Sequence, residues 1–349
     1  MTSFRKIAPL LLLTTSFTAC VTESKAHFSM SQLDAKQQID FAQAKIILLG
    51  EQHDNPDHHV IQQEILEKLG HEGRLKAVVF EQVDWTEQGL LSQLKPANLG
   101  KLREKIEWDK SGWPPYDLYE PLFATAVKYK AVVIAGGLPK NRLDLLYKHG
   151  YQGAFTAPEI ERLHLRKPMS AEALTLVGKE ISDGHCHMIP NEEATKMVPI
   201  QRARDAAMIR GYQNEAPRDG VTVFILGAGH ARKEFGVPSL LELVAPNARV
   251  WSVGMMEEGA KAPPVGAYDK VFITDAFERP DPCEAMKKHM DEKAVGKGNK
   301  KVPEDKDKKE LAPTDTQPSD GTPGPGDAPA TPPEDETPLK EDGPAADGE

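Results

Sequence analysis

The chain has few cysteines, no long apolar run and no excess of basic residues, and each absence excludes a class of protein. Three cysteines occur among 349 residues, without the Cys-x-x-Cys or Cys-x-x-Cys-His motifs of zinc ribbons and covalently attached c-type haem. No apolar run reaches the roughly 20 residues that a membrane-spanning helix needs. The formal net charge of -10 argues against nucleic acid as a partner, because its binders need a basic surface to displace counterions.

The N-terminus has the features of an export signal. Two basic residues precede a short apolar run at 7–13, and the sequence Phe17-Thr18-Ala19-Cys20 follows. The small residues before Cys20 resemble the bacterial lipobox, in which the cysteine is diacylated and becomes the first residue, although Phe17 replaces the usual Leu. We therefore predict lipidation at Cys20. An ordinary cleaved signal with a stray cysteine is the alternative.

The lipobox implies a bacterial cell-envelope protein that is tethered to a membrane by lipid. Each buried acyl CH₂ contributes about 0.8 kcal/mol, so several acyl chains hold a protein on a membrane without a spanning helix. Val21, in place of Asp, favours the outer membrane with the protein facing the periplasm. The expected organisation is a lipoprotein signal peptide at 1–19, an anchor and linker at 20–40, a folded domain at 41–280 and a tail at 291–349.

The expected tail is acidic and rich in proline. It holds 10 of the 28 prolines, 16 acidic against 8 basic residues, and no aromatic side chain. Its few large aliphatic residues bury too little apolar area to offset the entropy of ordering the chain. The composition therefore predicts a disordered segment.

Between linker and tail, short β-branched runs alternate with longer helical patterns, which predicts an α/β fold with a mostly parallel sheet flanked by helices. Several runs are continuously apolar, as in strands buried on both faces. The predicted strands are Lys45–Leu49, Ala77–Phe80, Ala131–Ala135, Val221–Leu226, Arg249–Val253 and Val271–Thr274. The predicted helices are Pro56–Leu69, Leu118–Tyr129, Asn141–His149 and Glu192–Tyr212. Residues 151–182 lack a convincing strand and are predicted to form a helical insertion between the halves of the sheet.

Acidic and imidazole side chains follow three of the predicted strands. Glu51 and His53 follow the first strand, Glu81 the second and His230 the fourth. Ligands of open α/β sheets collect beyond the carboxyl ends of the strands, so we expect these four residues to share one cleft. Two imidazoles and two carboxylates suit a divalent metal or general acid-base chemistry, with the glutamates as candidate catalytic groups. The simpler alternative for each histidine is a structural hydrogen bond.

Five segments together carry a family resemblance. They are, in chain order, Ile47-Leu48-Leu49-Gly50-Glu51-Gln52-His53-Asp54-Asn55, Phe80-Glu81-Gln82, Ser182-Asp183-Gly184-His185-Cys186, Gln201-Arg202-Ala203-Arg204-Asp205-Ala206-Ala207-Met208 and Gly229-His230-Ala231-Arg232-Lys233-Glu234-Phe235-Gly236-Val237-Pro238. This set resembles the ChaN family of haem-binding uptake proteins, within the Tiki superfamily, across roughly residues 40–257. The resemblance implies a lipoprotein that binds haem or assists iron acquisition. It also implies a fold shared with Tiki-type metal-dependent hydrolases, whose signature is a pair of Gly-x-x-His motifs plus a Glu.

Haem binding requires an apolar slot, one or two axial ligands, and cations for the propionates. The candidate haem-binding residues are Tyr119, His185, Arg204 and Tyr212, with Arg204 as a propionate partner. For the tyrosines the alternative is simple packing, for Arg204 a structural salt bridge, and for His185 a loop packed against the sheet. His53 or His230 could be the axial ligand instead. The sequence does not choose between them.

Three hypotheses follow. The leading one is a membrane-anchored haem-binding protein, with haem or another small molecule as partner and a homodimer around haem allowed. The second is a metal-dependent hydrolase that holds a divalent ion with Glu51, His53, Glu81 and His230. Many relatives have an Asn before Leu-Pro after the third strand, where this chain has Gly136-Gly137-Leu138-Pro139, and the missing polar side chain weakens the transfer of hydrolase activity. The third, a scaffold that uses its tail, leaves the strand-end residues unexplained. A disulfide between the two remaining cysteines, at 186 and 283, is allowed but not required.

Overall fold

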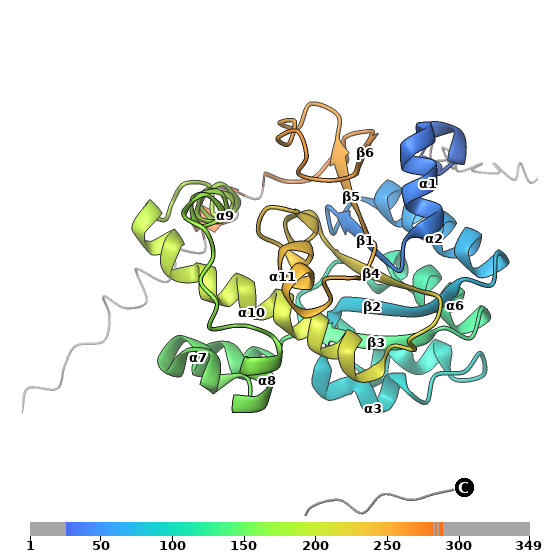
Figure 1. Ribbon diagram of the computed structural model, residues 1–349, viewed down its shortest axis with the longest axis horizontal. Helices are drawn as coiled ribbons and strands as arrows, with labels where there is room; N and C mark the ends of the chain where they lie inside the picture. Colours follow the sequence, from blue (N-terminus) through green and yellow to red (C-terminus); the bar gives the residue numbers. More distant parts are fainter. Residues whose placement is uncertain (1–25, 282, 285, 289–349) are drawn as a thin grey trace, which may run out of the picture. The chain divides into compact units, whose positions relative to one another are not determined.

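The computed structural model describes residues 26–281, 283, 284 and 286–288 (Figure 1). Lipidation at Cys20 and the tail at 291–349 therefore lie outside the described residues. The strands are β1 (Ile46–Glu51), β2 (Leu75–Asp84), β3 (Val132–Gly137), β4 (Val221–Gly227), β5 (Val250–Glu257) and β6 (Lys270–Thr274). The helices are α1 (Ala35–Gln43), α2 (Pro56–His71), α3 (Gln88–Leu91), α4 (Leu102–Lys105), α5 (Trp108–Ser111), α6 (Glu120–Lys128), α7 (Lys140–His149), α8 (Ala157–Arg162), α9 (Ala171–Gly184), α10 (Asn191–Glu215) and α11 (Val237–Val244).

The six strands form one sheet in the order β3-β2-β4-β1-β5-β6, and every pairing is parallel. This confirms the predicted α/β class. All four predicted helices are present, and the predicted insertion is α8 and α9, between β3 and β4. In the sheet, β1 lies between β4 and β5. At the centre of the sheet, strands from the first half of the sequence therefore alternate with strands from the second half. In the part of the chain that the structure describes, no helix is both long enough and apolar enough to span a membrane.

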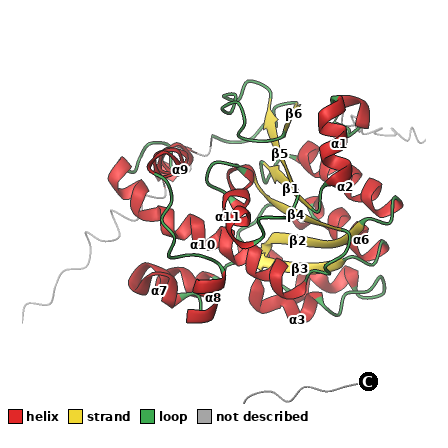
Figure 2. Cartoon of the chain, viewed as in Figure 1, coloured by secondary structure: helices red, strands yellow, loops and turns green. Residues whose placement is uncertain are grey.

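Helices cover both faces of the sheet, and alternation along each strand divides the core in two (Figure 2). On β1, Ile47 and Leu49 belong to the core under α2 and α6, whereas Ile46 and Leu48 belong to the core under α10 and α11. Side chains alternate between the faces of a strand with a period of two. Glu51 therefore continues the α2 and α6 side of β1. The same alternation on β2 sends Glu81 to the α10 side.

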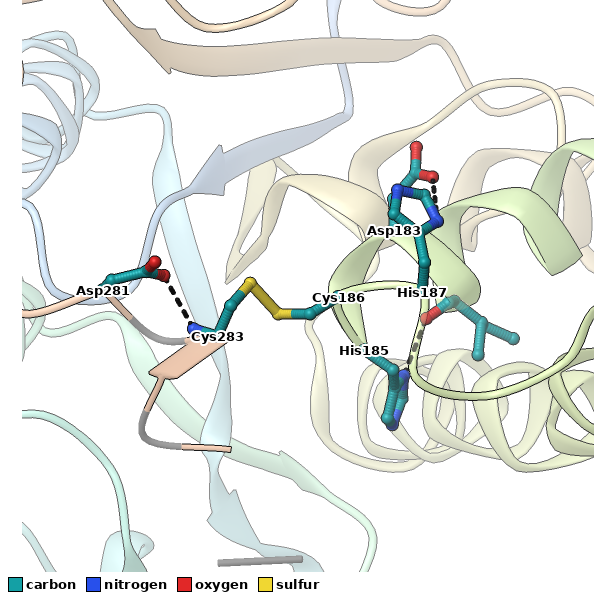
Figure 3. The surroundings of a disulfide bond; sticks show 7 residues. Asp183, His185, Cys186, His187, Asp281 and Cys283 are labelled. Carbon is teal, nitrogen blue, oxygen red and sulfur yellow. Dashed lines mark hydrogen bonds and ion pairs between the residues drawn. A yellow bond between two sulfur atoms is a disulfide. The ribbon is translucent and has the colours of Figure 1, made fainter. Parts of the chain in front are cut away.

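The segment after β6 is tied back to the insertion by a disulfide (Figure 3). Cys186, just after α9, is bonded to Cys283, and the two positions are 97 residues apart. Asp281 accepts a hydrogen bond from the backbone N–H of Cys283 at 2.8 Å. Arg279 pairs with Asp54, after β1, at 2.7 Å. These contacts hold the segment after β6 against both the insertion and the loop that follows β1.

Candidate functional site

The strand order places the carboxyl ends of β2, β4 and β1 side by side. Residues far apart in sequence thereby meet, because Glu51 ends β1, Glu81 lies near the end of β2, and His230 lies on the short 3-10 helix η6 (Ala228–Ala231) that follows β4. Gly50 faces this turn, where an added Cβ would lie 2.7 Å from the Ala231 Cβ. The absence of a side chain at Gly50 therefore lets η6 pack directly on β1.

The Glu51 carboxylate is buried and fully hydrogen-bonded. It accepts from the Tyr119 hydroxyl at 2.5 Å, from Gln62 Nε2 at 2.5 Å and from Gln82 Nε2 at 3.1 Å, and it lies 2.8 Å from His53 Nδ1. Burial would raise the pKa of this carboxyl, but the surrounding imidazoles and the Tyr119 hydroxyl lower it below its ordinary value. Glu51 is therefore an anion that fixes the ring of His53.

A second buried group joins Glu81, His230 and Asp205. His230 Nε2 lies 3.2 Å from Glu81 Oε1, and Nδ1 lies 2.6 Å from Asp205 Oδ1. Glu81 also accepts from the Gly227 backbone N–H at 2.8 Å. Burial alone would lower the pKa of His230, but the two carboxylates raise it to about 10. The pKa of Glu81 is held well below its usual range, against the effect of burial, mainly by His230. At neutral pH this group is a buried ion pair on the α10 side of the sheet.

His53 differs from His230 because it reaches solvent. Its side chain is 32 % exposed, and its ring meets the ring of Trp113 edge to face with centroids 4.9 Å apart. Among the described residues, no hydrogen bond reaches His53 Nε2. Burial would lower the pKa of His53, but the hydrogen bond to Glu51 and the nearby charge of Glu81 raise it above its ordinary value. In the neutral form of the ring Glu51 keeps the proton on Nδ1, so the lone pair is on Nε2, which lies beside Gly227 in the lining of the cleft.

The cleft beside His53 has a volume of about 570 Å³. Its floor comes from the ends of β1 and β4, and its walls come from α9 and from the segment between β5 and β6. The apolar lining residues are Leu176, Ala228, Met256, Ala262, Pro263, Pro264 and Tyr268. Lys179, Arg232 and Lys261 add positive charge. Arg232 already pairs with Glu234 at 2.7 Å, and Lys179 pairs with Asp183, which also lines the cleft, whereas Lys261 lies toward the rim.

The four residues predicted to hold a metal do meet, but in pairs. The Nδ1 atom of His53 faces Glu51, and both ring nitrogens of His230 face carboxylates. Within the described ranges, no group of three or more His, Cys, Asp or Glu side chains is arranged to hold a metal ion. Each carboxylate is directed at an imidazole nitrogen, which is the atom that a metal would need. The geometry therefore gives no support to the divalent metal of the hydrolase hypothesis.

The predicted haem-binding residues lie in four different places. Tyr119 is fully buried in the core with its hydroxyl on Glu51. Tyr212 packs against Phe224, with ring centroids 5.9 Å apart, away from the strand ends. His185 follows α9, and its Nδ1 atom lies 2.7 Å from the Ile181 carbonyl oxygen, beside the disulfide (Figure 3). Arg204 is exposed on α10 and lines a different cavity from His53. Of these four residues, only Tyr119 contacts the strand-end residues Glu51, His53, Glu81 and His230, and it does so by donating a hydrogen bond to Glu51.

Three residues that hydrogen-bond Glu51 or His230 were not predicted as site residues. Asp205 orients His230, while Gln62 and Gln82 orient Glu51. Gln201 and Asp205 are four residues apart and so lie on the same face of α10, which was the signal in the sequence. In the structure Gln201 Nε2 also lies 3.2 Å from His230 Nε2. The alternation of side chains along β2 could have revealed Gln82, because Gln82 faces the same side of the sheet as Glu51.

Comparison with solved structures finds several distant likenesses. A structure described as cofacial haem binding to ChaN of Campylobacter jejuni is 19% identical, with a TM-score of 0.48, over 68% of this chain and 90% of that one. The type III effector HopBA1 is 13% identical, with a TM-score of 0.40, over 69% and 93% of the two chains. A mutant of the erythromycin esterase EreC in its open conformation is 13% identical, with a TM-score of 0.36, over 73% and 83%. No curated protein matches the chain.

A family model matches the chain over residues 39–241. Its description is "Haem-binding uptake, Tiki superfamily, ChaN". The match spans more than half of the chain and includes the strand ends that carry Glu51, Glu81 and His230. The chain therefore belongs to the ChaN family of haem-binding uptake proteins in the Tiki superfamily.

Proposed function

We propose that this protein binds haem in the cleft beside His53 and serves haem or iron uptake at the bacterial envelope. The observation that carries the proposal is the orientation of His53. Its Nδ1 atom lies 2.8 Å from the buried Glu51 carboxylate, and its Nε2 atom has no hydrogen-bond partner among the described residues. A carboxylate behind an imidazole is the usual support of a histidine that binds a metal. The iron of haem is the metal that this family binds.

The residues around His53 fit a porphyrin. A cleft of about 570 Å³ lies within the range of small-molecule and cofactor sites. Apolar side chains such as Leu176 and Met256 would contact the macrocycle, while Lys261 supplies charge of the sign that propionates need. Once bound, haem would supply an iron centre for transfer or storage, and the protein would supply the ligand, the apolar walls and the charges.

We prefer His53 to the other candidate ligands because a bound haem could reach its free nitrogen. His230 is 5 % exposed, and both of its nitrogens face carboxylates. The Tyr119 hydroxyl is buried and already donates to Glu51. Iron binding at either residue would require breaking a buried charge-assisted hydrogen bond, whereas binding at His53 Nε2 breaks none.

We infer in addition that Cys20 carries the lipid anchor and that the protein faces the periplasm from the outer membrane. The Cys186–Cys283 disulfide supports export, because disulfides persist in oxidising compartments. A homodimer that shares haem between two such clefts is part of this proposal.

The test is a haemin titration of the purified protein followed by the Soret band. The wild type should give a saturable shift near one haem per chain, and His53→Ala should weaken binding at least tenfold. His149→Ala is the matched control, because His149 is exposed at the end of α7, outside the lining of the cleft. Equal affinity of His53→Ala and the wild type would exclude His53 as the ligand. A weak, nonsaturating change in the wild type would reject haem binding altogether.

A further inference from the structure

Helix α9 lines the cleft beside His53 but belongs to neither core of the sheet. The residues of α9 in the cleft lining are Leu176, Lys179, Glu180 and Asp183. Among the described residues, the apolar side chains of α9 pack instead in a small separate core that consists of Ala173, Val177, Val198 and Phe235. Glu180 also pairs with Arg232 at 3.3 Å, but half of the Glu180 side chain is exposed, and ion pairs open to solvent contribute little. A wall held by so small a core is prone to local opening.

The segment after β6, residues 275–283, forms a strap that is fixed to the opposite side of the cleft. Its Arg279 guanidinium pairs with Asp54 at 2.7 Å, and Arg279 Nη1 lies 2.9 Å from Glu257 Oε2. Asp54 follows His53 directly on the loop after β1, and Glu257 ends β5. Both carboxylates are partly buried, and charge-assisted hydrogen bonds to arginine are strong. This end of the strap is therefore held beside His53.

The other end of the strap is bonded to the end of α9 (Figure 3). The disulfide joins Cys283 to Cys186, and both cysteines are partly exposed. The strap thereby connects α9 covalently to the side of the cleft that carries His53. Without this bond, only the small core and the Glu180 ion pair described above would hold the wall.

The helix end at this disulfide is strained. Cys186 and His187 have φ angles of 55° and 56°. A left-handed residue commonly ends a helix, but it is usually glycine, because a side chain makes this conformation costly. Such strain persists where the surrounding structure enforces it. Breaking the disulfide would remove one covalent constraint on this strained turn.

We propose that the Cys186–Cys283 disulfide is a reversible latch on the wall of the cleft, and that its reduction releases the bound ligand. The identity of that ligand as haem rests on the proposed function. In the oxidised protein the latch holds α9 in place and the cleft stays formed. In the reduced protein α9 opens locally, and a haem beside His53 loses one of its walls.

The reductant is a protein dithiol, the chemical class that exchanges disulfides in the bacterial envelope. One thiolate of the dithiol attacks a sulfur of the Cys186–Cys283 bond, which forms a mixed disulfide and releases the other cysteine as a thiolate that takes up a proton. The second thiol of the reductant then displaces the remaining cysteine. Two electrons and two protons pass to this chain, which gains two thiols, and the dithiol becomes a disulfide.

Hydrogen exchange of the purified full-length protein tests the latch without any ligand. The probe is dithiothreitol, a small dithiol, and far-UV circular dichroism checks that the reduced protein stays folded. We expect the amides of α9 to exchange about tenfold faster or more after reduction, while those of α6 keep their rate, because only α9 loses its tie. The double variant Cys186→Ser/Cys283→Ser should exchange as the reduced protein does and should not respond to dithiothreitol. Unchanged exchange of α9 after reduction would overturn the proposal.

Two variants separate the latch from a general loss of stability. Leu69→Ala truncates a buried side chain of α2 and lowers the overall stability, yet it should leave the exchange of α9 at the wild-type rate. Arg279→Gln keeps the disulfide but frees the strap from Asp54, so the exchange of α9 should rise even in the oxidised protein. Arg218→Gln removes an exposed arginine outside the strap and is its matched control. A wild-type rate for α9 in Arg279→Gln would show that the strap does not hold the wall.

Release of haem is compared between the wild type and the double serine variant, without dithiothreitol, because thiols themselves ligate haem iron. Transfer of haemin to excess apomyoglobin should be about tenfold faster or more from the variant, since its cleft has lost a fixed wall. Equal transfer rates would overturn the role of the latch in release. A wild type that takes up no haem, with α9 still loosened by reduction, would reject the haem proposal and leave the latch standing. Haem binding with no loosening of α9 would do the reverse.

Discussion

At the scale of single residues, the site depends on how each titratable group is held. Glu51 and His53 lie two positions apart, yet one is fully buried and the other is partly exposed. The buried Glu51 accepts from three donors besides His53, and the exposed His53 keeps one nitrogen for a ligand. Burial therefore assigns the two residues different roles that their residue types alone do not.

The variant Tyr119→Phe tests whether Tyr119 supports Glu51 or is itself the haem ligand. The variant keeps the ring in the core but removes the hydroxyl that donates to Glu51 at 2.5 Å. Hydrogen bonds to charged groups contribute about 1.5–3 kcal/mol, so we expect the free energy of unfolding to fall by about that amount. Haem affinity, measured by the Soret titration, should stay within about threefold. A lost Soret shift in this variant, at intact fold, would instead make Tyr119 the ligand.

The buried His230 predicts a stability that declines in alkali. Its pKa is about 10 in the folded protein, because of the two carboxylates around it, against about 6.5 in an unfolded chain. A raised folded pKa stabilises the fold fully below about pH 6.5, and this contribution is lost as pH rises toward 10. Denaturant unfolding at pH 6 and pH 10 should therefore give a lower free energy at pH 10. In His230→Gln the pH dependence across this window should be shallower; an identical slope would contradict the prediction.

At the scale of elements, two helices supply the hydrogen-bond partners of the buried groups at the strand ends. α2 supplies Gln62 beneath Glu51, and α10 supplies Asp205 behind His230. The edge strand β3 is covered by α3, where the Gln88 side chain hydrogen-bonds the Val133 carbonyl oxygen and the Ala135 N–H. The β3 edge of the sheet is thus protected from pairing with another chain.

The disulfide is the element-scale feature most open to test. It joins α9 to the segment after β6 across 97 residues of chain, which in the loop-entropy account stabilises the fold by about 4–5 kcal/mol. We expect Cys186→Ser to lower the free energy of unfolding by up to that amount. Cys283→Ser and the double variant should match it, because each removes the same bond. Additive losses from the two single variants would mean that the cysteines act separately.

At the scale of the whole molecule, the proposed lipid anchor predicts where the protein is found. Cys20→Ser removes the acyl acceptor that the signal sequence predicts. Because the acyl chains are the proposed anchor, we expect the variant to move from the membrane fraction to the soluble fraction on cell fractionation. Cys283→Ser is the matched control and should remain with the membranes. A Cys20→Ser protein that still sediments with membranes would show that another contact holds it there.

Much of the architecture could be predicted because it is local. Continuous apolar runs become strands buried on both faces, and β1 and β4 begin within one residue of their predicted starts. The helix predicted over 118–129 begins later, at Glu120, after a short 3-10 turn at Tyr116–Leu118. Apolar periodicity does not distinguish these two helical forms over a single turn.

The sequence by itself determined the α/β class, the strand-end position of Glu51, Glu81 and His230, and the family. Hydrophobic pattern and motif spacing are properties of the chain alone. Only the tertiary structure decided that these residues form two separate imidazole–carboxylate groups, that Tyr119 supports Glu51, and that Arg204 and His53 line different cavities. Strand order and side-chain burial decide such matters, because they bring together segments that have no spacing in common along the sequence.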